Sequence, residues 1–280
     1  SGKVVAISRA ARQCGIPVAV FLRHAHFERL GGSPGNCEEI TYLANSEFTA
    51  SAYREHFGLE CTVVPPLVIP ELYKTSPDGS RVIFVNPNPV KGIDVVLWLA
   101  EQRPDIGFDI IESWTLAPHL TEVSKARAAA LDNVRWLPAT SDMRSIYAKG
   151  KLLLAPSGVG HPEWTEAWGR VATEAQINGL PVIATRSGGL PESVGAGGIL
   201  VDREAPLEAW LHALSLAWDD PGEYSRLSSA AREHSLRPEI QPGEIVRKLM
   251  SYVTPCVRRG ETYEQGDSSQ LQHGGGLLVR

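Results

Sequence analysis

The sequence predicts an α/β protein built on doubly wound parallel sheets of the Rossmann type. Short apolar runs such as Val18–Leu22 and Val182–Thr185 have the length and continuous hydrophobicity of parallel strands that are buried on both faces. Segments with helical periodicity alternate with these runs along most of the chain, as in a sheet wound with helices on both sides. Polar residues and glycines follow several of the runs, at the strand ends where such sheets bind their ligands.

Length and composition narrow the class of protein further. The chain has 280 residues, enough for two domains, and its apolar content of 43% and charged content of 21% are those of a globular protein. A formal net charge of −5 argues against a general affinity for nucleic acid or anionic membrane. No apolar run approaches the roughly 20 residues of an integral membrane segment, and the chain does not open with a secretory signal. Its 4 cysteines form no Cys-x-x-Cys pair, so we expect free thiols in a cytoplasmic protein.

Residues 1–77 are expected to form a partial N-terminal domain. A helix is expected at residues 1–14, strands at 18–22 and 61–64, and a strand followed by the start of a helix at 40–49. Ser46 and Thr49 are candidate N-cap residues for that second helix, which should end near Phe57. These strands are too few to bury both faces of a Rossmann-like sheet, so the sequence predicts an abbreviated or truncated domain.

Residues 78–241 are expected to form a second, nearly complete α/β domain, joined to the first by a stiff segment containing Pro65, Pro66 and Pro70. Its strands are expected at 81–86, 108–112, 134–138, 151–157, 182–185 and 198–202, and its helices at 91–99, 117–131, 142–148, 169–178, 207–218 and 221–234. An amphipathic helix is expected over 242–253, with Pro242 in the first turn, where its missing N–H costs nothing. Residues 254–280 have little apolar content and are expected to be a disordered tail.

Polar residues at the end of the first strand mark one candidate site. The run Arg23-His24-Ala25-His26-Phe27-Glu28 follows Val18–Leu22 directly, at a position where α/β folds place their chemistry. The pattern His-x-His-x-Glu is also compatible with a metal site, but no other His or Cys cluster completes a coordination set, so we expect no metal. A histidine that packs within the fold is the third interpretation.

Two glutamates in the stretch from His161 to Val194 mark the other candidate site. If Glu166 and Glu174 were both helical, a rise of roughly 1.5 Å per residue would separate them by about 12 Å. The paired carboxylates of glycoside hydrolases lie closer together, roughly 5 to 10 Å apart. The spacing favours a ligand with hydroxyl groups at both ends, such as a nucleotide sugar, although solvent-exposed helix acids give the same pattern.

The same stretch resembles the retaining glycosyltransferases of family 4, which have the two-domain GT-B fold. The matching motifs are Glu166-Ala167-Trp168-Gly169-Arg170-Val171, Glu174-Ala175, Gly179-Leu180-Pro181-Val182-Ile183-Ala184-Thr185 and Gly188-Gly189-Leu190-Pro191-Glu192. A contiguous block of this length is far more specific than two glutamates at this spacing. The resemblance runs from about residue 15 to residue 253 and implies that residues 78–241 are a nearly complete donor-binding domain. It implies that residues 1–77 are an acceptor-side domain that lacks the family's opening strands, and that the helix over 242–253 crosses back to that domain.

The resemblance implies roles for residues around the middle of a nucleotide-sugar donor. Lys91 would hold the diphosphate as a point charge. The helix start at Gly169-Arg170-Val171 would direct free main-chain N–H groups toward the same diphosphate. The family's usual arginine five residues before Lys91 is Asn86 here, so this site has one cation fewer.

At the two ends of the donor, the resemblance implies that Glu166 orients the sugar hydroxyls and Glu174 the ribose hydroxyls. The nucleobase would lie against main chain just after the strand that contains Leu137. The case for His24 as a contact to the sugar or the acceptor is weaker, because strict alignment places Arg23 at the family's histidine.

The implied function is transfer of a sugar, with retention, from a UDP-, GDP- or ADP-sugar to an acceptor that the sequence does not identify. The resemblance implies no metal and no cofactor besides the donor, because the leaving phosphate accepts the acceptor's proton. Two other classes fit the same residues. A non-catalytic nucleotide-sugar-binding module would explain the incomplete first domain, and a phosphorylase or sugar-nucleotide epimerase would share the GT-B fold.

Overall fold

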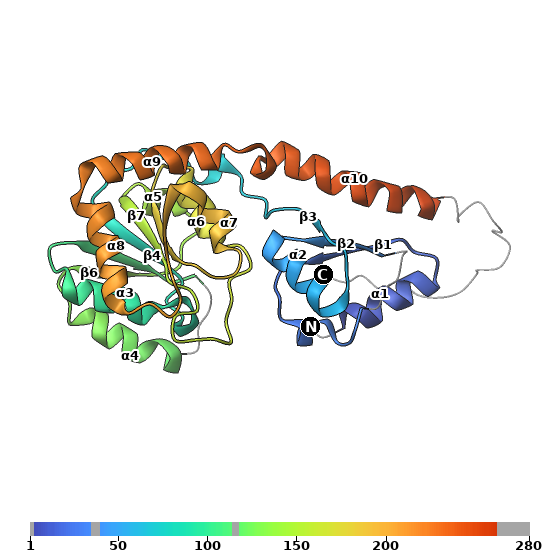
Figure 1. The fold of residues 1–280 in the computed structure, drawn as a ribbon, viewed down its shortest axis with the longest axis horizontal. Coiled ribbons are helices and arrows are strands. Elements are labelled where there is room, and N and C mark those ends of the chain that lie inside the picture. The colour runs from blue at the N-terminus through green and yellow to red at the C-terminus, as the bar shows by residue number, and fades with distance from the viewer. Residues whose placement is uncertain (1–2, 35–39, 114–117, 262–280) are drawn as a thin grey trace.

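The chain folds into two α/β domains, each built on a parallel sheet (Figure 1). The computed structural model describes residues 3–34, 40–113 and 118–261. In that part of the chain, the sheet of the first domain contains β1 (Val18–Leu22), β2 (Ile40–Ala44) and β3 (Thr62–Val63), in that order. The sheet of the second domain has the order β6 (Val134–Leu137), β5 (Gly107–Ile111), β4 (Arg81–Val85), β7 (Gly150–Ala155), β8 (Val182–Thr185) and β9 (Gly198–Val201).

The strand order of the second domain is that of the Rossmann fold. Strands along the chain progress outward from β4 to β6 and then return to add β7 on the other side of β4. A crevice forms at such a reversal, outside the carboxyl ends of the central strands, and it is the usual ligand site of the fold. The predicted class, α/β with doubly wound parallel sheets, is therefore confirmed.

The first domain packs two helices with its small sheet. These are α1 (Val4–Gln13) and α2 (Glu47–Phe57), with a short 3-10 turn η1 (Phe27–Leu30) between them. Ser46 is the N-cap of α2, because its hydroxyl accepts the N–H of Thr49 at 3.0 Å. Thr49, the other candidate, is therefore the donor in this cap. Thr49 lies three residues after Ser46, inside the first turn of the helix, where an N-cap side chain typically accepts an N–H group.

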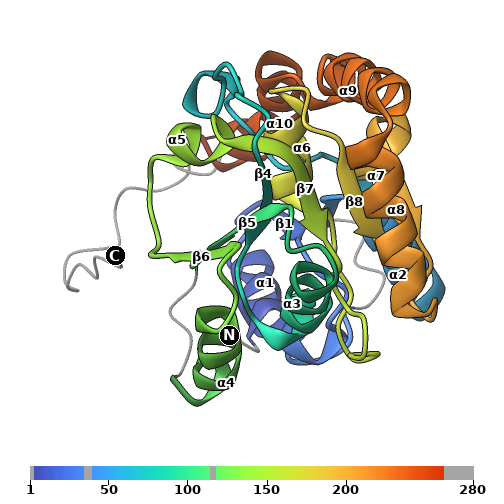
Figure 2. The same ribbon diagram turned by 90° about the vertical axis from the view of Figure 1, so that its left-hand side faces the viewer.

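Helices flank the second sheet on both faces (Figure 2). They are α3 (Ile93–Gln102), α4 (Pro118–Ala129), α5 (Met143–Tyr147), α6 (Arg170–Gln176), α7 (Leu190–Val194), α8 (Leu207–Asp219) and α9 (Pro221–Ser235). Alternate residues of β4 supply the two cores: Val82 and Phe84 join one apolar cluster, and Ile83 joins the other. This alternation is the direct result of the two-residue period of a strand.

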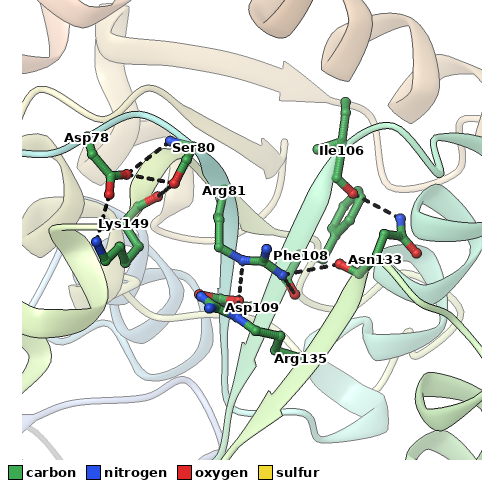
Figure 3. Close-up of polar contacts among 9 residues, drawn as sticks. All are labelled: Asp78, Ser80, Arg81, Ile106, Phe108, Asp109, Asn133, Arg135 and Lys149. Atoms are coloured by element: carbon green, nitrogen blue, oxygen red, sulfur yellow. Dashed lines mark hydrogen bonds and ion pairs between the residues drawn. The ribbon is translucent and has the colours of Figure 1, made fainter.

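A buried ion cluster ties together the amino-terminal halves of β4, β5 and β6 (Figure 3). Asp109 is 1% exposed, and both Arg81 and Arg135 pair with its carboxylate. Arg81 also donates to the carbonyl of Asn133 at 3.2 Å. The Asn133 amide in turn donates to the carbonyls of Ala100, Arg103 and Ile106, at the end of α3 and in the turn that follows it. These contacts stabilise the sheet at the amino-terminal ends of its strands, opposite to the ends that line the ligand crevice.

The final helix packs against the first domain. α10 (Pro242–Glu261) extends over the three-stranded sheet (Figure 1). Its Ile245 is buried with Leu43 and Val64 of the first domain. The helix was expected to end at residue 253, but it continues to Glu261, and the predicted tail beyond that point lies outside the described residues. No helix in the described ranges combines the length and the apolar content that a membrane span requires.

Candidate active site

A cleft of about 840 Å³ lies between the two domains. Its walls come from the end of β1, from the ends of β4 and β5, and from the loop that joins β7 to α6. The sequence-predicted residues that line it are His24, Asn86, Lys91, Glu166, Gly169, Arg170, Val171 and Glu174. Residues that are up to 150 positions apart in the chain thus share one cavity, at the strand ends where the fold binds ligands.

Lys91 and Glu166 form an ion pair in the wall of this cleft. The Lys91 ammonium contacts Glu166 Oε2, and the two side chains are 12% and 20% exposed. Ser157 Oγ lies 3.4 Å from the same carboxylate oxygen, and the ammonium lies 4.8 Å from the centre of the Trp164 ring. Because the pair is largely shielded from water, its field is stronger than that of a surface pair. Lys91 itself ends the 3-10 turn η3 (Pro89–Lys91) and does not begin a helix, which starts only at Ile93.

Glu166 lies in a loop and not on a helix, so the separation calculated for two helical glutamates does not apply. The loop is held by the glycine pair that precedes α7. The N–H of Gly189 donates to the carbonyl of Glu166 at 2.8 Å. Gly188 has a φ of +60°, and a Cβ built on it would lie 2.2 Å from the same carbonyl oxygen. The Gly-Gly-Leu-Pro-Glu motif therefore has a local physical function, because only glycine permits this close approach to the Glu166 loop.

Glu174 faces the cleft from α6 and is only 6% exposed. The hydroxyl of Tyr147 donates to its Oε2 at 3.0 Å, and Arg170 Nη2 lies 3.5 Å from Oε1. Burial raises the pKa of Glu174, whereas hydrogen bonds from Tyr147 and the charge of Arg170 lower it. Tyr147 is fully buried, and burial also raises the pKa of its hydroxyl, so it stays a hydrogen-bond donor. A buried carboxylate held by two side chains is well suited to accept hydroxyl groups from a ligand.

Asn86 occupies an unusual backbone conformation at the end of β4. Its φ is +72°, in the left-handed region where asparagine is one of the few tolerated side chains. The residue is 5% exposed and lines the cleft, and among the described residues its Oδ1 has no hydrogen-bond partner. A buried polar atom without a partner is costly, and a ligand group can supply one.

The first domain contributes histidines to the opposite wall. His24 Nδ1 accepts the N–H of His26 at 3.3 Å, and the carbonyl of His24 accepts the hydroxyl of Tyr53 at 3.2 Å. Burial lowers the pKa of His24, and so does the charge of Arg29. The His26 ring lies 5.7 Å from the Trp164 ring of the second domain, so the two walls meet at this point. Arg23 also lines the cleft, which leaves both His24 and Arg23 available to a ligand.

Leu137 does not line the cleft. It is the last residue of β6, and its side chain packs against the apolar cluster of the second domain. Ala139 and Thr140, in the loop that follows, do line the cleft. In the part of the chain that the structure describes, no group of three or more His, Cys, Asp or Glu side chains is placed to hold a metal ion.

Three neighbours of the site had no assigned role in the sequence analysis. Tyr73 comes from the linker between the domains, Tyr147 from α5 and Glu192 from α7. Tyr73 and Tyr147 both contact the surroundings of Glu174, and Glu192 bonds the main chain of α2. Glu192 carried a sequence signal as the last residue of the glycine-containing motif, whereas neither tyrosine belongs to a motif.

Comparison with known proteins matches the chain to glycosyltransferases. A family model described as "Glycosyl transferases group 1" matches residues 78–234, more than half of the chain. D-inositol 3-phosphate glycosyltransferase of Streptomyces griseus is 38% identical over 235 aligned residues, covering 78% of this chain and 45% of that protein. The same enzyme of Corynebacterium kroppenstedtii is 37% identical over 121 residues, covering 42% of this chain and 25% of that protein. The chain thus spans about a quarter to a half of the length of these curated relatives.

Solved structures share the two-domain arrangement. HepE of Anabaena, crystallised in complex with UDP, superposes with a TM-score of 0.78 at 19% identity, covering 91% of this chain and 77% of that one. HepE in complex with UDP-glucose superposes with a TM-score of 0.73 at 20% identity, covering 94% of this chain and 77% of that one. At these identities the likeness concerns the fold.

Proposed function

The chain belongs to the glycosyl transferases group 1 and has their GT-B fold, and we propose that its cleft transfers a sugar from a nucleotide-sugar donor to an acceptor. One observation carries the proposal: Lys91, Glu166 and Glu174 line the same interdomain cleft. The cation suits a diphosphate, and each carboxylate suits a hydroxyl-bearing group. A nucleotide sugar has these three parts in that order, with the diphosphate in the middle.

In this proposal the donor diphosphate lies beside Lys91, next to the N–H groups of Arg170 and Val171 in the first turn of α6. Those N–H groups have no carbonyl partner within the helix. The sugar lies at Glu166 and the ribose at Glu174. When the donor binds, the Lys91 ammonium contacts both the phosphate and Glu166. The ion pair with Glu166 therefore holds the ammonium in place before the phosphate arrives.

The chemical step that we propose is departure of the nucleoside diphosphate with retention at the anomeric carbon. The bond from the anomeric carbon to the phosphate oxygen breaks, and the electron pair leaves with the phosphate. The acceptor hydroxyl attacks the same face of the sugar, and the departing phosphate takes its proton. Lys91 and the fixed N–H dipoles stabilise the growing negative charge, so the residues of this cleft supply the electrostatic stabilisation without a metal.

The acceptor side of the cleft supports an acceptor that carries negative charge. Arg23 and Arg29 line this wall together with His24, both arginines are exposed, and no ion pair of either arginine is present among the described residues. The curated relatives are named for D-inositol 3-phosphate, which is a phosphorylated polyol. We propose a phosphorylated polyol as the acceptor class here. A phosphorylated polyol should accept sugar, whereas its dephosphorylated form should be a much poorer substrate.

The test of the proposed function begins with UDP-, GDP- and ADP-sugars in a thermal-shift panel. A bound donor stabilises the folded protein by mass action and so raises its melting temperature. At a ligand concentration of a hundred times Kd, the free energy of unfolding rises by about 2.7 kcal/mol. UDP-sugars come first because the similar HepE structures hold UDP and UDP-glucose. Transfer is then measured with the matching donor in the presence of a chelator, and the anomeric configuration of the product is read by NMR. Inverted stereochemistry, or loss of transfer in the chelator, would contradict the proposed mechanism.

The same assays distinguish the alternative functions. A non-catalytic binding module would give a thermal shift without donor hydrolysis or transfer to any acceptor. A phosphorylase would require free phosphate, and an epimerase would interconvert donors without an acceptor. Absence of a shift with every nucleotide sugar would contradict the whole proposal.

A further inference from the structure

The linker between the two domains reaches the cleft through Tyr73. Tyr73 follows the short 3-10 turn η2 (Pro70–Leu72), is half-buried and lines the cleft. Its hydroxyl accepts a hydrogen bond from Arg170 Nη2 at 3.2 Å. Its ring meets the Tyr147 ring edge-on, with 6.4 Å between the centroids. A residue of the connecting segment therefore contacts the guanidinium that pairs with Glu174.

The hydroxyl of Tyr73 also lies near the carboxylate of Glu174, because Arg170 bonds this hydroxyl and pairs with that carboxylate. Burial raises the pKa of Tyr73, and the neighbouring carboxylate raises it further, so the hydroxyl keeps its proton at neutral pH. It can then donate to Glu174 while it accepts from Arg170. Tyr147 bonds the carboxylate directly, and Tyr73 bonds the guanidinium that pairs with it, so two separate segments of the chain restrict its orientation.

Asn178 fastens this part of the linker to α6. The side chain is 4% exposed, and its Nδ2 donates to the carbonyls of Tyr73 and Glu174, both at 3.1 Å. Its Oδ1 accepts the N–H of Thr75 at 2.7 Å. One buried amide thus bonds the linker on both sides of residue 74 and the helix that carries Glu174. The position of the Tyr73 hydroxyl is consequently fixed relative to the Glu174 carboxylate.

We propose that Tyr73 is a positioning residue of the nucleotide subsite, where it orients the Glu174 carboxylate and the Arg170 guanidinium to bind the ribose diol. A carboxylate has about four acceptor positions, so Glu174 can accept ribose hydroxyls in addition to its contacts with Tyr147 and Arg170. Because Tyr73 lies on the linker, occupation of the ribose subsite is coupled to the conformation of the segment that joins the domains. The inference rests on the proposed function, since it requires that a nucleotide occupies this side of the cleft.

The test compares Tyr73→Phe with wild type by calorimetric titration of UDP and of 2′,3′-dideoxy-UDP. The substitution removes only the hydroxyl, and we expect UDP to bind about tenfold more weakly, the usual effect of losing one hydrogen bond near a charged group. The dideoxy nucleotide lacks the diol and should bind both proteins equally. In a Glu174→Gln background, Tyr73→Phe should have little further effect, because the two residues act on the same group. With the donor as substrate, KM should rise while kcat stays within about twofold.

Tyr224→Phe is the matched control, because Tyr224 is half-buried on α9 beside Lys151 and does not line the cleft. It should leave UDP affinity unchanged, and circular dichroism melts should show that both variants are folded. Equal UDP affinity in wild type and Tyr73→Phe, tighter binding by the variant, or an equal loss for the dideoxy nucleotide would overturn the inference. If wild type and Tyr73→Phe bind UDP with equal affinity, only the role of Tyr73 fails. If wild type binds no nucleotide, the proposed function fails together with it.

Discussion

The carboxylate of Glu192, in the second domain, accepts a 2.8 Å hydrogen bond from the main-chain N–H of Phe48, in the first domain. It accepts a second bond of 2.8 Å from the N–H of Glu47. Both donors lie in the first turn of α2, where N–H groups lack helical partners and the helix dipole favours an anion. The carbonyl of Glu192 accepts from His234 Nε2 at 3.1 Å, which holds this part of α7 in place. The two domains are thus joined by charged hydrogen bonds as well as by the linker.

Replacing Glu192 by alanine should loosen this junction. Each hydrogen bond to a charged group contributes about 1.5–3 kcal/mol, although water can replace part of it at this half-exposed position. We expect a larger radius of gyration in small-angle X-ray scattering and about tenfold lower kcat/KM. Glu204→Ala is the control, because Glu204 is exposed and does not line the cleft. Unchanged scattering and kcat/KM in Glu192→Ala would show that the contact does not set the domain arrangement.

The two motif glutamates should differ in which step they affect. Glu174→Ala should weaken UDP binding about tenfold or more, because it removes the proposed acceptor of the ribose hydroxyls. Glu166→Ala should leave UDP affinity nearly unchanged and mainly lower turnover, because UDP lacks the sugar that Glu166 is proposed to orient. Calorimetry measures the first effect and steady-state kinetics the second. Equal UDP affinity for wild type and Glu174→Ala would count against the assignment.

Lys91→Met should reduce turnover about 10²–10³-fold, the usual cost of losing one group that stabilises the charge of a transition state. The substitution also leaves the Glu166 carboxylate without its cation in a site shielded from water. Lys149→Met is the control. The Lys149 ammonium lies 2.8 Å from the Asp78 carboxylate, and neither residue lines the cleft. Single-turnover rates at saturating donor measure the effect. If Lys91→Met had the same turnover as wild type, Lys91 would not be the residue that stabilises the departing diphosphate.

Nucleotide affinity should depend on pH through Glu174. Burial raises the pKa of this carboxyl above its ordinary value, so it takes up a proton at a higher pH than a solvent-exposed glutamate does. Ribose hydroxyls donate to the ionised form, and the affinity contributed by Glu174 is therefore full above the raised pKa and lost as the pH falls through it. UDP titrations between about pH 8 and pH 5 measure the slope. Glu174→Gln is the control: it lacks the titrating carboxyl, so its pH dependence reports the protonation of UDP itself. If UDP affinity changed with pH in the same way for both proteins, the prediction would be contradicted.

Asp109→Ala should destabilise the second domain by about 3–5 kcal/mol, because removing one partner of a buried ion cluster leaves charge without compensation. Asp109 is 1% exposed, and the remaining Arg81 side chain is only 19% exposed. Asp105→Ala is the matched control: its carboxylate pairs with Arg103 but is 59% exposed, so the loss should be about 1 kcal/mol or less. Denaturant-induced unfolding measures both. If both substitutions lowered the free energy of unfolding equally, burial of the Asp109 ion cluster would not be the source of its stabilising effect.

Local patterns were sufficient for most elements of secondary structure. The apolar run at 182–185 is β8, the Ser46 hydroxyl caps α2, and Gly169 directly precedes α6. These features depend on residues close together in the chain, through hydrophobic periodicity and capping. The loop conformation of Glu166 was not predictable in the same way, because it depends on the carbonyl contact with Gly189, which comes from the next strand-helix connection.

By itself, the sequence determined the class of fold, the positions of the strands and helices, and the motif residues that follow the strands of the second domain. Only the tertiary structure decided that Glu192 bonds Phe48, that Tyr73 meets Tyr147 beside Glu174, and that α10 packs on Leu43. The physical reason is chain separation. Periodicity and capping act over a few residues, whereas Glu192 and Phe48 are 144 positions apart and meet only after two domains have formed and docked.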